Sequence, residues 1–455
     1  MPKVQTAPWG DLGYSTMEAW KRNTYTFASW MRAVSEPSLY EVPFGWMTPL
    51  GAMVPIAKIF NAYARVLTDE TREHAKPAWG ISETVINGKS YPVRDVVVDE
   101  KPFGNLVHFE CDGAPAGRPK LLLFAPLSGH HATLLRKTVK DSLSHFDVYV
   151  TDWVDAKHVP LSAGKFDFHD FINYCKDYVG IVQPHATMAV CQPTVAVAAA
   201  LALRAAESLP NPRAAIFMAG PIDVSFSPTK VNDLANEKGI DWFKNNCIHQ
   251  VTPGHEGAGR AVYPFFLQEA AFKAMNQDLH REKHNGKAMD ILKGNLAGVA
   301  AHDEFYDEYN SGLDLPAEFY LQTLQTVFMD RDLAKGTLMH EGRPVDMKRL
   351  GDTIDIFTVE GEKDDICGLG QTRVLHDLCS NVPDDNKHHH TVKGAGHMGV
   401  FSGKKYLQDV LPRAVKVVYN ALGLPLPVFE DKTSPTRVGA APSAPALDAR
   451  IAVPA

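Results

Sequence analysis

The residues best placed to do chemistry centre on a cysteine at the end of an apolar stretch. The segment Ala189–Pro193 leads from that stretch into an alanine-rich one that we expect to be helical. A tight turn from strand to helix raises one side chain above a sheet, as in the G-x-S-x-G nucleophile turn. Here cysteine replaces the serine, with Ala189 and Pro193 in place of the glycines, and proline suits the first turn of a helix. Because helix N-terminal donors stabilise a thiolate, we predict that Cys191 is a nucleophile rather than a cysteine that fills a core gap.

A thiolate nucleophile needs a histidine and an acid, and the chain supplies both downstream. In this type of arrangement the order is nucleophile, acid, histidine. Asp364 lies 173 residues after Cys191, and His397 follows 33 residues later in a glycine-rich turn. The glycines allow close backbone approach, so we predict His397 as the base and Asp364 as the acid that fixes its tautomer. Asp365 is the second choice for the acid, and Asp223 is the third.

A loop after an apolar run is expected to hold the oxyanion of a tetrahedral intermediate. Leu127 or Ser128 in this loop should contribute one backbone N–H, and Gln192 should contribute the other. His130 and His131 lie beside the same loop and are candidate substrate contacts.

Two further polar clusters fit structural roles better than metal binding. His388–His390 lie on an expected strand, where adjacent side chains point to opposite faces. His302, Asp303 and Glu304 are interleaved with aromatic residues and fit a charged helix face. The sequence contains no zinc, phosphate-loop or dinucleotide fingerprint, so we expect no metal and no cofactor.

The elements that must position these residues indicate an α/β fold. Asn87-Gly88 is a hairpin signal, and further along short apolar runs alternate with helical stretches. The runs are 121–124, 148–150, 188–190, 214–217 and 354–357. Continuous apolar strands separated by helices are typical of a parallel sheet covered on both faces. We therefore predict a doubly wound, mostly parallel sheet.

The rest of the chain divides around this core. We predict an N-terminal helical extension over 1–80 and an α/β core over 81–223 and 351–425. The interval 224–350 is far longer than a crossover needs and is rich in helix formers and aromatics, so we expect a helical cap over the carboxyl edge of the sheet. The proline- and alanine-rich tail, 426–455, is expected to be disordered.

Two stretches of the N-terminal extension carry apolar residues at helical spacing. The first row is Met17, Trp20, Thr24, Phe27 and Met31. The second row is Leu50, Met53, Ala57, Phe60, Ala64 and Leu67, and Pro55 is expected to kink that helix. We expect both rows to pack on the main domain. Contact with a hydrophobic surface is the alternative.

Length, charge and cysteine content narrow the class of protein. The chain has 455 residues with a net charge of −7, which argues against a mainly electrostatic nucleic-acid binder. No apolar run reaches the roughly 18 residues of a membrane span, and no signal-peptide pattern occurs at the start. The six cysteines are scattered, without the density of a disulfide framework. We expect a protein of a reducing compartment, the cytoplasm.

Seven short segments, taken together, are more specific than the order of the three catalytic candidates. They are PLSGH (126–130), TLLR (133–136), VCQP (190–193), FYDEY (305–309), DLP (314–316), VEGEKDDI (359–366) and GAGHMG (394–399). With them the chain resembles the intracellular, cysteine-type polyhydroxybutyrate depolymerases, which belong to the α/β-hydrolase superfamily. The resemblance implies hydrolysis of a storage polyester by a triad at Cys191, Asp364 and His397, through a thioester. It also implies action on polymer chains and oligomers at the surface of storage granules, and it leaves a homodimer open.

Two other functions compete with hydrolysis. Related polyester synthases also use cysteine with aspartate and histidine, but their turn is usually G-x-C-x-G, and this chain lacks both glycines. A non-catalytic granule-coat protein is the third hypothesis, and the intact order of the triad argues against it.

The resemblance also raises the question of how the protein reaches an insoluble polymer. A net charge of −7 does not draw a protein to a hydrophobic surface, so we expect apolar contact. We predict docking through aromatic residues of the cap. The cap residues are Phe265, Phe266 and Phe319, and the rival set in the N-terminal extension is Trp20, Trp30 and Trp46.

Overall fold

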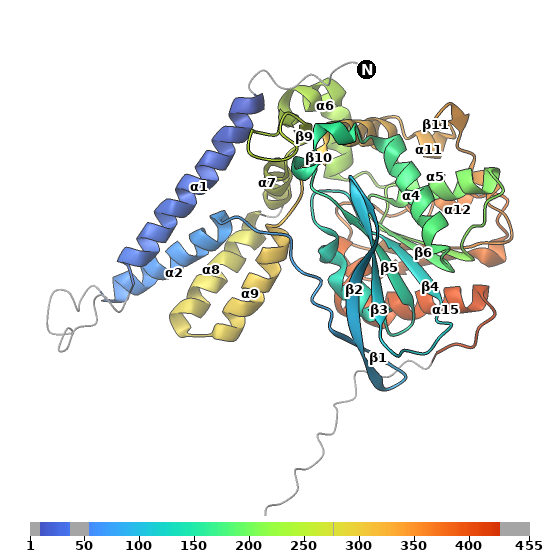
Figure 1. Ribbon diagram of the computed structural model, residues 1–455, viewed down its shortest axis with the longest axis horizontal. Coiled ribbons are helices and arrows are strands. Elements are labelled where there is room, and N and C mark those ends of the chain that lie inside the picture. Colours follow the sequence, from blue (N-terminus) through green and yellow to red (C-terminus); the bar gives the residue numbers. More distant parts are fainter. Residues whose placement is uncertain (1–9, 37–53, 276, 428–455) are drawn as a thin grey trace, which may run out of the picture.

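The fold is built on a nine-stranded sheet in the order β1-β2-β3-β5-β4-β6-β7-β13-β14 (Figure 1). The computed structural model describes residues 10–36, 54–275 and 277–427. The strands are β1 (Glu83–Ile86), β2 (Lys89–Lys101), β3 (Gly104–Cys111), β4 (Lys120–Phe124), β5 (Asp147–Trp153), β6 (Ala186–Val190), β7 (Ala214–Met218), β13 (Asp355–Gly361) and β14 (Lys387–Val392). From β5 to β14 all neighbours are parallel, whereas β1, β2 and β3 pair antiparallel. The prediction of a mostly parallel α/β sheet is confirmed.

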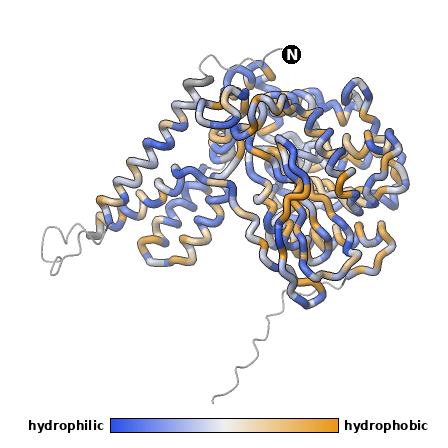
Figure 2. The backbone as a smooth tube through the Cα atoms, in the orientation of Figure 1, coloured by the Kyte–Doolittle hydropathy of each residue, from blue (hydrophilic) through white to orange (hydrophobic). Residues whose placement is uncertain are grey.

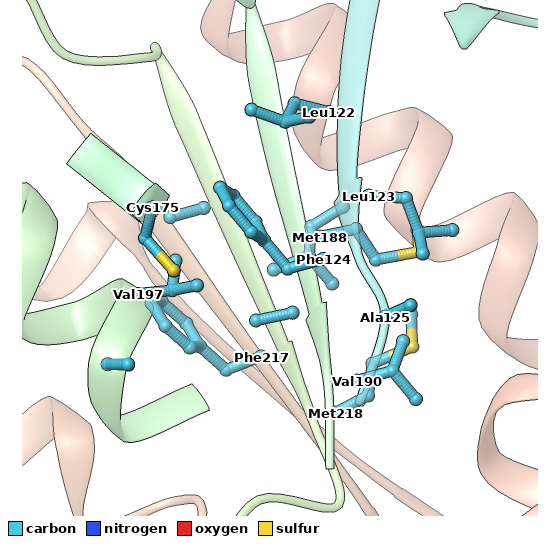
Figure 3. Close-up of a cluster of buried hydrophobic side chains, with 14 of the residues drawn as sticks. Leu122, Leu123, Phe124, Ala125, Cys175, Met188, Val190, Val197, Phe217 and Met218 are labelled. Atoms are coloured by element: carbon cyan, nitrogen blue, oxygen red, sulfur yellow. The ribbon is translucent and has the colours of Figure 1, made fainter. Parts of the chain in front are cut away.

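The central strands are mostly apolar because helices cover the sheet. Every residue of β6 and β7 is buried, and Figure 3 shows Phe124, Val190 and Phe217 among the side chains of this core. The helices of the core are α3 (Arg136–Ser142), α4 (Phe168–Val182), α5 (Thr194–Ala206), α12 (Leu375–Leu378), α13 (His397–Phe401), α14 (Gly403–Lys405) and α15 (Leu411–Ala421). The predicted turn at Asn87-Gly88 joins β1 to β2, and both of its residues have positive φ.

The interval between β7 and β13 is mainly helical. Its elements are α6 (Lys230–Cys247), β8 (His249–Gln250), β9 (Ala261–Tyr263), α7 (Phe265–Met275), α8 (Gln277–Lys293), α9 (Leu296–Tyr309), β10 (Leu315–Pro316), α10 (Ala317–Thr323), α11 (Asp332–Lys335), β11 (Met339–His340) and β12 (Arg343–Pro344). We call this interval the cap. A β-bridge joins His130 to Gly312, and Leu313 N–H donates to the Gly129 carbonyl at 2.8 Å. The cap therefore meets the loop that follows β4.

The N-terminal extension forms two helices, α1 (Gly10–Val34) and α2 (Val54–Thr71). Helix α2 packs against both α1 and α8, and α8 packs against α9. Helices α1 and α2, which we call the helical arm, project together with α8 and α9 to one side of the core (Figure 1). Pro55 is the second residue of α2, so the kink expected there is wrong. Proline is tolerated in a first helical turn because its missing N–H has no acceptor there.

The environments predicted for two sets of aromatic residues, packing for those of the N-terminal extension and a docking surface for those of the cap, are also wrong. Trp20 and Phe27 are each 56% exposed and do not pack on the main domain. In contrast, Phe265 and Phe319 are buried at 9% and 1% exposure, and Phe266 is partly buried against Tyr14. Phe319 fills the space between the cap and α4, because it contacts aromatic rings on the core side. These cap aromatics therefore serve packing and present no docking surface.

Some expectations fall on parts of the chain that the structure leaves out. Trp46 and nearly all of the tail 426–455 lie outside the described residues. Within the described ranges, no helix combines the length and the apolar character that a bilayer crossing requires.

Candidate active site

Cys191 occupies the sharp turn between β6 and α5. Its φ is +64°, a left-handed conformation that is unfavourable for a residue with a Cβ and that marks strained functional turns. The Cys191 N–H donates to the Met218 carbonyl at 2.8 Å, which ties the turn to β7. Thr194, the first residue of α5, donates its N–H and its hydroxyl to the Cys191 carbonyl. A hydrogen bond to β7 on one side and hydrogen bonds from α5 on the other therefore hold the turn in place, as a strained conformation requires.

His397 begins helix α13 and lies between Cys191 and Asp364. His397 Nδ1 is 2.8 Å from Asp364 Oδ2 and 3.0 Å from Oδ1. Cys191 lies close enough to this ring to raise its pKa, and because Asp364 holds Nδ1, Nε2 is the nitrogen left for the sulfur. The Asp364 carboxylate is itself held, since Oδ1 accepts the N–H groups of Ile366 and Cys367 at 2.9 and 2.8 Å. The structure thus brings the three predicted catalytic residues into one chain of contacts.

The electrostatics of this cluster favour a charged imidazole. Burial lowers the pKa of His397, but the charge of Cys191 and hydrogen bonds to Asp364 and Cys191 raise that pKa to about 10. An imidazolium beside a thiolate is the resting form that an activated cysteine nucleophile needs.

The other two acid candidates do not meet His397. Asp365 is exposed, whereas the Asp364 side chain is fully buried. Asp223 Oδ1 lies 3.2 Å from Arg331 Nη1 and forms an ion pair with it. The geometry therefore supports Asp364 ahead of the two alternatives.

The oxyanion loop shows a contact that the sequence could not reveal. Leu127 N–H donates to Gln192 Oε1 at 3.0 Å, so the side chain of Gln192 occupies one of the predicted donors. Gln192 Nε2 is buried and has no hydrogen-bond partner among the described residues. This amide must move before Leu127 can bind an oxyanion. The N–H groups of Ser128 and Gln192 donate to no acceptor in the described part of the chain.

His130 and His131 are both buried at the junction of core and cap. His130 Nε2 lies 3.2 Å from the Tyr309 carbonyl, and its ring packs against Phe265. Burial lowers the pKa of His130 to about 4 and is also the main cause that lowers the pKa of His131 to about 3. Both rings are therefore neutral near pH 7, and the contacts of His130 are those of a packing residue.

The remaining polar clusters lie away from the triad. His388–His390 lie on the edge strand β14, and His390 Nε2 is 2.8 Å from Asp409 Oδ2. His302 and Asp303 lie on α9, where Asp303 pairs with Lys287. Among the described residues, no group of three or more histidine, cysteine and acidic side chains is arranged to hold a metal ion.

Four of the other cysteines have thiol pKa values that burial raises. All six cysteines carry free thiols. Burial raises the pKa of Cys247 to about 11 and of Cys379 to about 12, and it raises the pKa values of Cys175 and Cys367 well above the usual value of a thiol. These four side chains stay protonated near neutral pH and are poor nucleophiles.

Comparison with known families agrees with this geometry in the C-terminal half of the chain. Residues 219–421 match the family model described as "PHB de-polymerase C-terminus". Over these residues the chain is similar to the C-terminal part of PHB depolymerases. The matched part includes Asp364 and His397 and begins after Cys191.

A curated relative and several solved structures are also similar. The poly(3-hydroxyalkanoate) polymerase subunit PhaC of Haloferax mediterranei is 30% identical over 104 residues, which are 23% of this chain and 20% of that protein. The chain thus matches about a fifth of the length of this relative. The α/β hydrolase GrgF of Penicillium sp. sh18 aligns over 73% of this chain and 100% of its own, with 13% identity and a TM-score of 0.41. Carboxyl esterase 2 of Tuber melanosporum aligns over 80% and 97%, with 11% identity and a TM-score of 0.34. Scores this low support no conclusion about activity.

Proposed function

We propose that this protein hydrolyses an intracellular polyhydroxybutyrate-type polyester through a thioester at Cys191. The observation that carries the proposal is the contact of His397 with both Cys191 and the buried Asp364, at a strained turn between strand and helix. The match of residues 219–421 to PHB depolymerases supplies the substrate class.

The first half of the reaction forms an acyl-enzyme. The Cys191 thiolate attacks an ester carbonyl of the polymer, and the carbonyl π electrons move to oxygen. Backbone N–H groups of Gln192 and of the 127–128 turn stabilise this oxyanion. When the tetrahedral intermediate collapses, the C–O bond breaks and the imidazolium of His397 gives its proton to the leaving alkoxide. A shortened chain with a free hydroxyl leaves, and a thioester remains on Cys191.

The second half uses water. His397, now neutral, takes a proton from water, and the hydroxide attacks the thioester carbonyl. Collapse of the second intermediate expels the Cys191 thiolate and releases a 3-hydroxy acid or a short oligomer. Asp364 holds the ring orientation and stabilises the imidazolium in both halves. No step requires a metal or an organic cofactor.

The substrate class sets the proposed partners and location. A storage polyester is insoluble, so the protein acts at the surface of polymer granules and on the chains and oligomers exposed there. We place this activity in the cytoplasm, where such granules are stored.

A polyester synthase activity is the second candidate, because the matched segment of the Haloferax mediterranei protein belongs to a polymerase subunit. The test incubates the purified protein with amorphous polyester particles and, separately, with 3-hydroxybutyryl-CoA. Hydrolysis predicts release of 3-hydroxy acid from the particles, which should disappear in Cys191→Ala. Release of CoA with growth of polymer would support the synthase instead. Neither product, from protein that binds the particles, would indicate a granule-coat protein.

A further inference from the structure

Helices α1 and α2 expose an apolar face that lies outside the catalytic core. The side chains of this face are all exposed; they are Trp20, Phe27, Trp30 and Val34 on α1 and Ile56, Ile59, Phe60, Tyr63 and Leu67 on α2. We call these nine residues the arm face. Trp20 and Trp30 are 56% and 59% exposed, and the rings of Phe27 and Trp30 stack at 6.2 Å. Figure 2 shows hydrophobic stretches on the arm as well as in the central sheet. So large a solvent-exposed apolar area marks an interaction site rather than ordinary surface.

The two rows of the arm face lie on the same side of the helix pair. Asn61 donates to the Arg32 carbonyl at 3.0 Å, and Thr68 lies beside Tyr25, so α1 and α2 run antiparallel. Viewed along each helix from its N-terminus, the exposed row lies roughly a third of a turn from the face that contacts the other helix. The direction of this rotation is the same in both helices. In an antiparallel pair that geometry directs both rows to one side, and they form a single surface.

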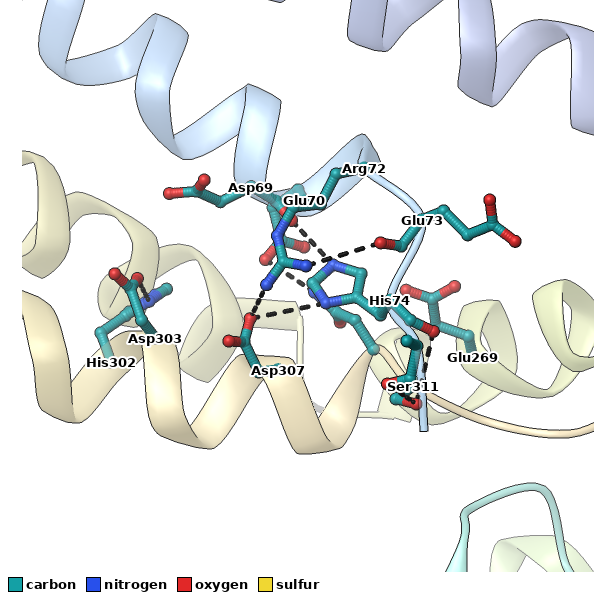
Figure 4. A network of polar contacts seen from close by, with 12 residues as sticks. Asp69, Glu70, Arg72, Glu73, His74, Glu269, His302, Asp303, Asp307 and Ser311 are labelled. Atoms are coloured by element: carbon teal, nitrogen blue, oxygen red, sulfur yellow. Dashed lines mark hydrogen bonds and ion pairs between the residues drawn. The ribbon is translucent and has the colours of Figure 1, made fainter. Parts of the chain in front are cut away.

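The opposite side of the arm is already occupied by polar contacts with the cap. Lys21 Nζ lies 2.9 Å from Glu269 Oε2, and the Tyr14 hydroxyl donates to Asp314 at 2.6 Å. Figure 4 shows a network from the end of α2 to α9, in which Arg72 and Asp307 form an ion pair. These contacts fix the orientation of the arm, so the arm face stays directed outward.

The arm face carries no charge. By helical position, the charged residues Glu18, Lys21, Arg22 and Arg32 of α1 lie on the side opposite Trp20 and Phe27. On α2, Lys58 and Arg65 likewise lie opposite the exposed row. Glu70 continues that row by helical position, but it is paired with Lys273 of the cap at 2.8 Å. A partner that is recognised by charge, such as a nucleic acid or an anionic headgroup, finds no counterpart here. The matching partner is itself uncharged and apolar.

We infer that the arm face docks the protein on the surface of its polyester substrate. This inference rests on the proposed function. An aliphatic polyester presents methyl and methylene groups with ester carbonyls, which accept hydrogen bonds and donate none. The arm face offers apolar area together with the indole N–H donors of Trp20 and Trp30, which complements both properties.

A second copy of the chain fits the arm face less well. Trp20, Phe27 and Val34 are spaced by seven residues, as in a coiled-coil seam. The intermediate seam positions hold Asn23 and Trp30 in one register, or Thr24 and Met31 in the other. Each register therefore includes a polar residue, and a wide aromatic ring fits poorly as a knob in a helical seam. A polymer surface does not require the side chains that bind it to fit into the holes of a helical seam.

The binding test uses the Cys191→Ala protein, so that binding is separated from degradation. In this background, Trp20, Phe27 and Trp30 are replaced together by serine, and the matched control replaces the exposed cap aromatics Phe226 and Trp242. Co-sedimentation with amorphous poly(3-hydroxybutyrate) particles should weaken at least about tenfold in the arm variant and little in the control. Binding of the parent protein should persist at high salt, because salt screens charges and not apolar contacts. Circular dichroism checks that the exposed substitutions leave the fold intact.

Further measurements decide between the alternatives. Unchanged particle binding in the arm variant would overturn the inference, as would stronger binding to neutral phosphatidylcholine vesicles than to the particles. A dimer in light scattering that the arm substitutions dissociate, with particle binding unchanged, would assign the face to a second copy. With Cys191 intact, the arm variant should retain kcat/KM on a soluble 3-hydroxybutyrate trimer and lose activity on particles. If the wild-type protein cleaves neither substrate, the proposed function fails, and the binding result stands separately.

Discussion

At the scale of single residues, the site depends on which carboxylate holds the imidazole. Asp364 is fully buried and contacts His397 Nδ1, whereas Asp365 is exposed. Asp364→Asn should therefore lower kcat for ester hydrolysis by about four orders of magnitude, the loss seen when a serine-protease triad is altered in this way. Asp365→Asn should change kcat by less than about threefold, because surface substitutions have small effects. Steady-state kinetics with a soluble oligomer measures both, and equal losses would remove Asp364 from its role.

The charge of His397 gives a second prediction at this scale. Burial lowers the pKa of His397, and Cys191 with Asp364 raises it to about 10. In Cys191→Ala the sulfur charge and its hydrogen bond are gone while burial remains, so the pKa should fall. NMR titration of the ring in the two proteins measures the shift. In the wild type, the stability gained from this raised pKa is full below the unfolded value of 6.5 and is lost as the pH rises through about 10. An identical pKa in both proteins would contradict the thiolate–imidazolium pair.

At the scale of elements, the nucleophile turn depends on the close approach of the loop after β7 to the start of α5. A Cβ on Gly220 would lie 2.1 Å from Thr194 Oγ1, the hydroxyl that donates to the Cys191 carbonyl. Gly220→Ala should destabilise the fold by about 1–3 kcal/mol and reduce turnover, because Thr194 must shift. Thermal unfolding and kinetics measure the two effects. The control is Gly351→Ala, where a Cβ meets no atom within 4 Å, and a similar loss there would point to a general intolerance of the substitution.

At the scale of the whole molecule, a buried carboxylate joins the N-terminal helix, the cap and the core. Asp314 in the cap accepts a hydrogen bond from Tyr14 of α1, and its N–H donates to Asp155 of the core at 3.1 Å. Burial and the charge of Asp155 raise the pKa of Asp314 to about 6, while the bond from Tyr14 lowers it. The arm, the cap and the catalytic core are thus coupled through one titratable group.

Removing the Tyr14 hydroxyl should weaken this junction in a pH-dependent way. A carboxyl with a raised folded-state pKa stabilises the fold increasingly as the pH falls from above 6 towards its unfolded value of 3.8. Tyr14→Phe leaves the charged form without its donor, so the loss should be about 1–3 kcal/mol at pH 8 and smaller at pH 5. Denaturant unfolding at the two pH values measures the difference. Tyr25→Phe, at an exposed site on the same helix, is the control, and an equal loss at both pH values would contradict the account.

The sequence alone determined the features that depend on local pattern. Continuous apolar runs between helices indicated the parallel sheet, and the turn at Cys191 was recognisable from the small residue before it and the proline after it. The order of Cys191, Asp364 and His397 indicated the site because strand ends of a parallel sheet meet at one edge. Each of these signals lies within a few residues of the sequence or in the order of its elements, so none of them depends on the tertiary structure.

Tertiary structure alone decided which apolar residues face solvent and which polar groups meet. Helical spacing marks one side of a helix as apolar but does not say what covers it, so Trp20 and Phe265 were assigned the wrong environments. The contact between Leu127 and Gln192 joins positions 65 residues apart, and the bond between Tyr14 and Asp314 joins positions 300 apart. Such pairs depend on how elements pack across the whole chain, because burial and hydrogen bonding are properties of the space between elements and not of the residues within one.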